Sequence, residues 1–138
     1  MTKNNKIPVW AKEFLYEMER LKKKAPKGQI YDYDQFNLNV LKKTGRGNCI
    51  AISRLFIEIL RKYNVDSVQK MDIGILDQNE DNHRIILVYQ TPGRIWLQSN
   101  DKLICFKTYH QLMKYAGDEW NWTDKGLAVI KQAWISWC

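Results

Sequence analysis

Apolar residues recur at helical spacing through the first half of the chain, whereas the second half contains short continuous or alternating apolar runs. The helical spacing predicts helices over residues 8–24 and 48–63, each with its charged residues largely outside the apolar stripe. A shorter helix is expected from near Asp34 to Thr44, because a glycine-containing turn follows it. The first half of the chain is therefore predicted to be helical.

The second half is predicted to form strands. The expected strands cover residues 67–76, 84–89, 95–99 and 103–106. A short helix is expected over residues 109–115, and residues 118–138 fit either a helix that begins at Thr123-Asp124 or a strand with Trp-rich ends. Helices followed by an antiparallel meander predict an α+β fold, with the N-terminal helices packed on the meander, in a single domain spanning residues 1–138.

The charge balance is basic, with a net charge of +7. Only six of the 22 basic residues are Arg, and the lysines cluster at residues 22–24, 27, 42 and 43. A basic balance favours acidic partners such as nucleic acid, anionic lipid or acidic protein. The alternative is that these lysines are solvated helix faces that keep the protein soluble. Because base-reading sites use Arg more than Lys, nucleic acid is the weaker expectation.

The cysteines point to a reducing compartment. Cys49, Cys105 and Cys138 form no Cys-x-x-Cys pair, and three is an odd count. The first ten residues have no apolar core typical of a signal peptide, and no stretch approaches the ~20 apolar residues of a membrane span. We therefore expect a cytoplasmic protein without a membrane partner. The scattered cysteines and two histidines show no zinc spacing, so no metal or other cofactor is implied.

Cys49 is the candidate nucleophile. It follows the glycine-containing turn at residues 44–48 and opens the amphipathic helix. At a helix start the unsatisfied backbone N–H groups and the positive end of the dipole stabilise a thiolate, which is the reactive form of cysteine. The same N–H groups can bind the oxyanion that develops during acyl transfer. The alternative is that Cys49 is a small buried apolar residue, as free cysteines often are.

His83 is the candidate general base. It lies where the polar loop at residues 77–82 ends and the apolar strand begins, and a strand provides a fixed platform for a base. The alternative is a surface histidine whose hydrogen bonds are satisfied locally. The second histidine, His110, falls in a predicted surface helix and is expected to be structural.

A third group normally orients the catalytic imidazole. If Pro92-Gly93 occupy the centre of the hairpin turn, strand alternation places His83 on the same face as Gln98 and Asn100 of the next strand. Either amide could orient the histidine, and neither carries a negative charge. The pattern leaves both candidates open.

The order of these features resembles the bacterial transglutaminase-like cysteine peptidases of the papain/transglutaminase-like fold superfamily. That family has a Gly-Asp-Cys helix start and a strand that begins with His. Here Gly47-Asn48-Cys49 opens the helix and His83 opens the strand, and the resemblance covers residues 30–107. It implies the superfamily's fold, with Cys49 as the nucleophile and His83 as the base.

The same resemblance identifies two departures. In that family a Leu-Asp-Asn strand end supplies the triad carboxylate, and Gly93 and Leu97 fall where the family pattern places them, so Gln98 occupies the Asp position. Asn48 also replaces the usual Asp before the cysteine, which is expected to change a local hydrogen bond only. A neutral orienting group stabilises imidazolium less than a carboxylate does, although Asn100 would give a papain-like Cys-His-Asn triad.

Together these features predict a cysteine-nucleophile hydrolase or acyltransferase of the peptidase, amidase or transglutaminase type. Cys49 attacks an acyl carbon of a protein or peptide, His83 transfers the proton, and Asn100 or Gln98 orients the imidazole. The backbone N–H of Cys49, together with the side chain of Gln35, is expected to bind the oxyanion.

Two other functions stay open. A binding module whose catalysis has decayed would use the same fold and bind a peptide or protein through Trp side chains, and the missing carboxylate motivates it. A nucleic-acid or anionic-surface binder is motivated by the lysine clusters. The small size and the high Lys and Asn content are compatible with a bacterial or phage accessory protein, and nothing in the sequence indicates an oligomeric state.

Overall fold

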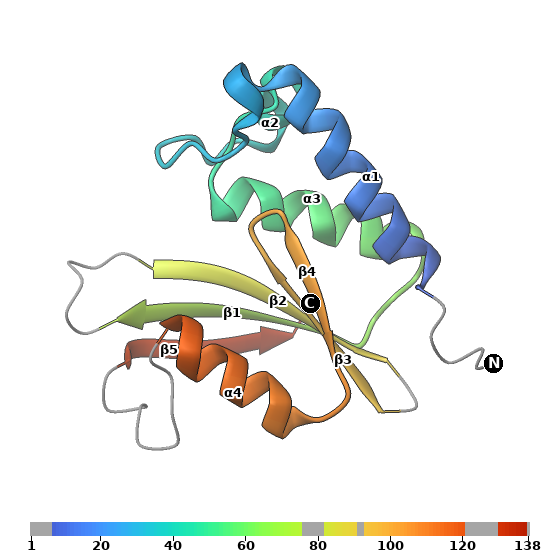
Figure 1. The fold of residues 1–138 in the computed structure, drawn as a ribbon, viewed down its shortest axis with the longest axis vertical. Coiled ribbons are helices and arrows are strands. Elements are labelled where there is room, and N and C mark those ends of the chain that lie inside the picture. The colour runs from blue at the N-terminus through green and yellow to red at the C-terminus, as the bar shows by residue number, and fades with distance from the viewer. Residues whose placement is uncertain (1–6, 76–81, 91–92, 121–129, 138) are drawn as a thin grey trace. The chain divides into compact units, whose positions relative to one another are not determined.

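The computed structural model describes residues 7–75, 82–90, 93–120 and 130–137. These residues form two compact units, a helical unit within Met1–Asp66 and a sheet unit within Ser67–Cys138 (Figure 1). Helices precede an antiparallel sheet along the chain, so the prediction of an α+β protein is confirmed.

The described residues of the helical unit form four helical segments. They are α1 (Val9–Lys24), the 3-10 turn η2 (Pro26–Gly28), α2 (Leu38–Thr44) and α3 (Cys49–Lys62). The predictions for α1 and α3 are confirmed to within one residue. The second helix begins later than predicted, because the Asn37 side chain caps it by accepting hydrogen bonds from the N–H groups of Asn39 and Val40.

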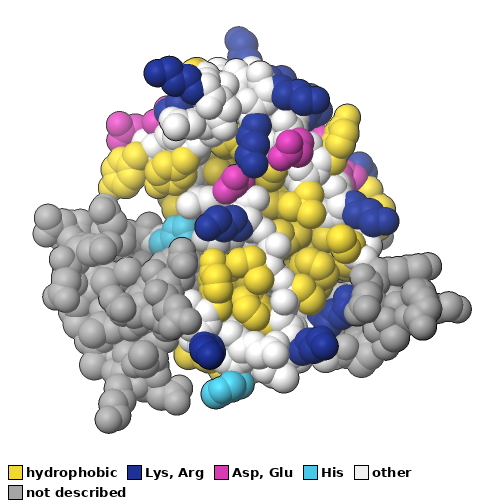
Figure 2. Space-filling view, in the orientation of Figure 1, with side chains coloured by type: hydrophobic (Ala, Val, Ile, Leu, Met, Phe, Trp, Pro, Cys, Tyr) yellow, Lys and Arg dark blue, Asp and Glu magenta, His cyan; other side chains and the backbone are white. Residues whose placement is uncertain are grey.

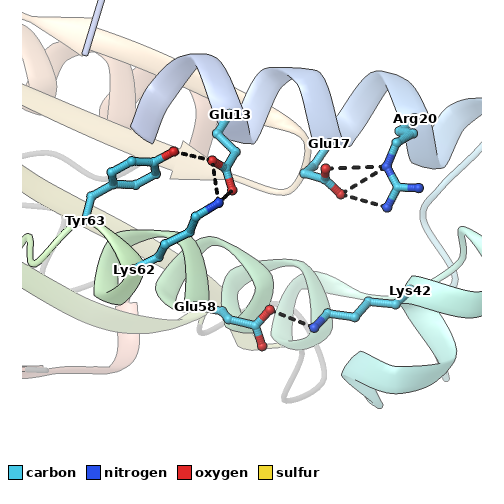
Figure 3. Close-up of polar contacts among 7 residues, drawn as sticks. All are labelled: Glu13, Glu17, Arg20, Lys42, Glu58, Lys62 and Tyr63. Atoms are coloured by element: carbon cyan, nitrogen blue, oxygen red, sulfur yellow. Dashed lines mark hydrogen bonds and ion pairs between the residues drawn. The ribbon is translucent and has the colours of Figure 1, made fainter. Parts of the chain in front are cut away.

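Aromatic packing joins α1 to α3. The Phe14 and Phe56 rings meet edge-on with their centroids 4.7 Å apart, and the Trp10 ring lies 5.9 Å from Phe56. At the edge of this contact the Glu13 carboxylate accepts hydrogen bonds from the Tyr63 hydroxyl and from Lys62 Nζ at 3.0 Å (Figure 3). These two donors, the Tyr63 hydroxyl first, lower the pKa of Glu13.

The described residues of the sheet unit form five antiparallel strands in the order β4-β3-β2-β1-β5. The strands are β1 (Val68–Ile75), β2 (Asn82–Gln90), β3 (Arg94–Ser99), β4 (Lys102–Phe106) and β5 (Ile130–Trp137). The first four form the predicted meander. β5 pairs with β1, so residues 130–137 form a strand and the helix alternative for them is wrong. The helix start expected at Thr123-Asp124 lies outside the described residues.

Helix α4 (Tyr109–Trp120) covers one face of this sheet (Figure 1). Leu112 and Ala116 of α4 pack against apolar side chains that alternate along the strands. The strand residues of this cluster are Ile85, Leu87, Ile95, Leu97 and Phe106. The opposite face is also apolar, because Ile86 and Val88 are buried as well.

The register of β2 against β3 differs from the predicted one. The prediction paired Thr91 with Arg94, whereas the structure pairs Gln90 with Arg94 and Ile85 with Ser99. Side chains alternate between faces along a strand, so a shift of one residue transfers the whole of β3 to the other face. Gln98 therefore lies opposite Ile86, on the face of the sheet away from α4.

Within the described residues, no helix combines the length and apolar character that a membrane span requires.

Candidate functional site

The segment before Cys49 is held against a second segment, residues 30–36. The Gly47 N–H donates to the Ile30 carbonyl at 2.9 Å, and the Asp32 N–H donates to the Gly47 carbonyl at 3.0 Å. A side chain at Gly47 would place a Cβ 2.9 Å from Ala51 Cβ, which is closer than real Cβ contacts come. Glycine is therefore required here for the chain to enter α3 this tightly.

Asn48 is the N-cap of α3 and accepts hydrogen bonds from most of the N–H groups of the first turn, which have no partner within the helix. Its Oδ1 accepts from the N–H groups of Ile50 at 3.0 Å and Ala51 at 3.2 Å, and its carbonyl accepts from Ile52. Among the described residues, the Cys49 N–H is left as the one amide of this turn without a partner. The structure thus leaves available the backbone donor that the sequence predicts for the oxyanion.

The Cys49 side chain is buried, with 6% of its surface exposed. Cys105, on β4, is the exposed cysteine. Partial burial raises the pKa of the Cys105 thiol, and the nearby Arg94 opposes that shift. The Cys49 and Cys105 side chains differ in exposure, so chemical labelling can distinguish them. Cys138 lies outside the described residues.

Gln35 is brought next to the start of α3. The Asn48 N–H donates to the Gln35 carbonyl at 2.6 Å, and the Gln35 Oε1 accepts from the Asn37 N–H at 3.0 Å. Within the described residues the side-chain Nε2 of Gln35 has no hydrogen-bond partner. The structure therefore joins Gln35 to the residue directly before Cys49 and leaves its amide donor available.

An exposed aromatic loop, defined as residues 31–36, borders the same helix start. Tyr31, Tyr33 and Phe36 are 44%, 62% and 58% exposed. The Asn48 Nδ2 donates to the Tyr33 carbonyl at 3.0 Å, which fixes the loop to the residue before Cys49. The sequence analysis did not identify this loop, although three aromatic residues in a polar six-residue segment were a visible signal.

The Trp residues were predicted to bind a peptide from an exposed surface, but the two whose side chains the structure describes are buried. Trp10 and Trp96 are each 6% exposed and belong to the interior, and the Trp96 Nε1 donates to Gln90 Oε1 at 2.8 Å. The exposed aromatic side chains beside the candidate nucleophile are Tyr and Phe instead. The other four Trp residues have side chains outside the described part of the chain.

His83 lies in β2, on the face of the sheet that carries Ile85 and Leu87. It is half-buried, and its Nε2 lies 2.8 Å from the Oγ of Ser99 on β3. Ser99 itself is buried, with 8% of its surface exposed. Ser99 is therefore in the position to orient the imidazole, and sequence analysis missed it because the predicted register was one residue off.

Gln98 and Asn100 are directed to the β3–β4 turn. Gln98 is fully buried, and its Nε2 donates to the Asn100 carbonyl at 2.7 Å. Asn100 has a left-handed backbone with φ of 52°. The prediction that Gln98 shares a face with His83 is wrong, since strand alternation puts Gln98 on the other face, whereas Asn100 lies beyond the end of β3 in the turn and its pairing with His83 stays a prediction. Gln98 Oε1 and Asn100 Oδ1 are buried and have no partner among the described residues.

The surface position expected for His110 is confirmed, whereas the pairing of Cys49 with His83 is not tested by the structure. His110 is exposed on α4, as expected of a structural surface histidine. Cys49 belongs to the helical unit and His83 to the sheet unit, and their pairing stays a prediction. Across the described stretches, no three His, Cys, Asp or Glu side chains gather as metal ligands would.

No protein-family model matches the chain, and a search of the curated proteins found no match either.

Proposed function

We propose that this protein is a cysteine-nucleophile hydrolase or acyltransferase with a papain/transglutaminase-like fold that acts on a protein or peptide. The observation that carries the proposal is the start of α3. There, Cys49 occupies the first helical position, its own N–H is available, and the backbone carbonyl of Gln35 accepts from the N–H of Asn48, the preceding residue. A nucleophile whose own backbone N–H is free has one of the donors that stabilise the oxyanion of acyl transfer, and we assign the second donor to the Gln35 side chain.

In the proposed reaction, the Cys49 Sγ attacks the acyl carbon of an amide or ester and His83 accepts the thiol proton. The Cys49 N–H and the Gln35 Nε2 donate to the oxyanion of the tetrahedral intermediate. His83 then protonates the leaving amine or alcohol as the C–N or C–O bond breaks, which leaves a thioester on Cys49. Water attacks the thioester in a hydrolase, and an amine attacks it in an acyltransferase.

The aromatic loop supports a peptide or protein substrate. Tyr and Phe side chains are enriched where proteins recognise other chains, because they provide large contact areas that are only partly polar. Tyr33 and Phe36 are more than half exposed and lie on a loop hydrogen-bonded to Asn48. An acyl group presented by this loop would reach the start of α3.

The test is the reactivity of Cys49 and its dependence on His83. In the native protein we expect iodoacetamide to alkylate Cys49 faster than Cys105 at neutral pH, although Cys49 is the buried thiol. His83→Ala should slow Cys49 roughly tenfold or more, because an unassisted thiol is only a few per cent thiolate at pH 7. Peptide mapping by mass spectrometry measures the rate at each cysteine.

His110→Ala is the matched control, since it removes the other histidine and should leave both rates unchanged. Cys49→Ala should abolish p-nitrophenol release from p-nitrophenyl acetate and leave the circular dichroism spectrum unchanged. Faster labelling of Cys105, or a Cys49 rate that does not respond to His83→Ala, would contradict the proposal.

A second candidate is a binding module on the same fold that lacks catalysis. The residue at the family's carboxylate position is Gln98, which is fully buried and hydrogen-bonded to the Asn100 carbonyl. In this case the aromatic loop would bind a peptide without cleaving it. Slow labelling of Cys49 that is insensitive to His83 would favour this second function.

A further inference from the structure

The positive charge of the protein resides in one of its two units. Residues 1–66 contain 14 basic and seven acidic residues, whereas residues 67–138 contain eight of each. The whole net charge of +7 therefore belongs to the helical unit. An asymmetry of this size indicates an anionic partner for that unit.

Within the helical unit, packing gathers lysines that are distant in sequence. The last turn of α1 contributes Lys22–Lys24 and the last turn of α2 contributes Lys42 and Lys43. The two helix ends meet at Gly45, where an added Cβ would lie 2.5 Å from the Leu21 carbonyl oxygen. The Lys24 Nζ also donates to the Lys42 carbonyl at 2.9 Å. Figure 2 shows Lys and Arg side chains at the end of the helical unit where α2 lies in Figure 1.

Ion pairs neutralise only part of this cluster. Lys42 pairs with Glu58 at 2.7 Å (Figure 3), and Lys22 pairs with Glu19 at 3.5 Å. Three other lysines are exposed and have neither a hydrogen-bond nor an ion-pair partner among the described residues. They are Lys23, Lys27 and Lys43, and together with Lys24 we call them the lysine surface.

Lys27 indicates that the charge serves a purpose beyond helix stability. Lysines in the last turn of a helix complement its dipole, which accounts for Lys23 and Lys43. Lys27 has no such role, because it lies in a tight turn with a left-handed backbone, φ 55° and ψ 23°. That conformation is uncommon for residues other than Gly and Asn, so a lysine there carries a conformational cost.

We propose that the lysine surface binds the phosphate backbone of duplex nucleic acid, independently of the chemistry at Cys49. Protein interfaces are depleted in Lys and enriched in aromatic residues, and helices that bind membrane surfaces add an exposed apolar face to their basic residues. The exposed large apolar side chains of the described residues all lie outside residues 20–30 and 37–46, which contain the lysine surface. A surface that exposes lysines without apolar side chains is suited to bind the regularly spaced phosphates of a nucleic-acid backbone.

The residue types of the lysine surface also indicate which form of nucleic acid it binds and whether it reads the sequence. Single strands are bound by aromatic side chains that stack on bases, and the lysine surface has none. Base edges are read mainly by Arg, Asn and Gln, whereas Lys provides point contacts with phosphates. The structure thus points to sequence-independent binding of a duplex, with an affinity that falls steeply as salt concentration rises.

The test is fluorescence anisotropy of the 138-residue protein with a short fluorescein-labelled DNA duplex between about 50 and 200 mM salt. The site variant replaces Lys23, Lys27 and Lys43 with Gln. Losing three phosphate contacts should weaken binding roughly tenfold or more at the lowest salt and reduce the slope of log K against log salt by about 2 to 3. A duplex of unrelated sequence should bind equally.

The matched control replaces three exposed lysines of the sheet unit, Lys102, Lys107 and Lys114, with Gln. Both variants have a net charge of +4, so a local site predicts that only the first variant loses affinity. Thermal unfolding of both variants checks that they fold. Equal weakening by the two variants, absence of duplex binding at low salt, or tighter binding to polyglutamate or anionic vesicles than to the duplex would overturn the proposal.

Discussion

At the scale of single residues, Asn48 connects three parts of the candidate site. Its Oδ1 caps α3, its backbone N–H binds the Gln35 carbonyl, and its Nδ2 binds the Tyr33 carbonyl. In the transglutaminase-like family that we propose for the chain, Asp occupies this position. Asp could supply the cap but not the donor to Tyr33, so an amide is the side chain that makes both contacts.

This role predicts that Asn48→Asp destabilises the protein. The carboxylate keeps the cap but loses the hydrogen bond to Tyr33, which is worth about 1 kcal/mol, and it faces a carbonyl oxygen instead. Asn37→Asp is the matched control, because Asn37 caps α2 in the same way and its side-chain amide has no such acceptor. Negative charge at a helix start should leave that variant unchanged or more stable by about 0.3–1 kcal/mol.

Urea denaturation measures both free energies of unfolding. An equal response of the two variants would show that the hydrogen bond from Asn48 to Tyr33 contributes nothing.

At the scale of elements, the sequence predicts the long helices and the strands, because an apolar stripe or run is a local signal. It also identifies Cys49 at a helix start, which depends only on the neighbouring turn. The register of β2 against β3 was not predictable in this way. It depends on the turn that joins the strands, and an error of one residue put Asn100 opposite Ile85, where the structure has Ser99, and put Gln98 on the face of His83.

The contact of α2 with the end of α1 predicts a strong effect of Gly45→Ala. Both Gly45 and Gly28 have a left-handed backbone, with φ of 79° and 70°, so Ala at either position costs about 1–2 kcal/mol. A Cβ at Gly45 also meets the Leu21 carbonyl oxygen and Lys24, whereas nothing lies within 4 Å of a Cβ at Gly28. Overpacking should therefore add about 1–3 kcal/mol at Gly45 alone.

Chemical denaturation of Gly45→Ala and Gly28→Ala tests this directly. Equal loss in the two variants would mean that the helix ends are free to separate, and the lysine surface would then lose its fixed geometry.

At the scale of the whole molecule, the two units carry different chemistry. The helical unit has the candidate nucleophile, the aromatic loop and the whole net charge, whereas the sheet unit has His83 and the Ser99 hydroxyl that contacts it. Apolar periodicity reports which residues face a core within an element. It carries no information on which side chains of two separate units meet, so the proposed catalytic pair needs a measurement that spans them.

A double-mutant cycle that measures the rate of Cys49 alkylation provides that measurement. If Ser99 orients His83 and His83 activates Cys49, Ser99→Ala should slow Cys49 alkylation in the native background and have no effect in a His83→Ala background. Gln98→Leu should behave additively with His83→Ala, because Gln98 lies on the other face of the sheet and binds the β3–β4 turn. Coupling through Gln98 instead of Ser99 would show that the β2–β3 pairing in solution follows the sequence-based register. Absence of coupling through either residue would show that the imidazole of the sheet unit does not activate the thiol of the helical unit. The helical unit would then act through its binding surfaces alone.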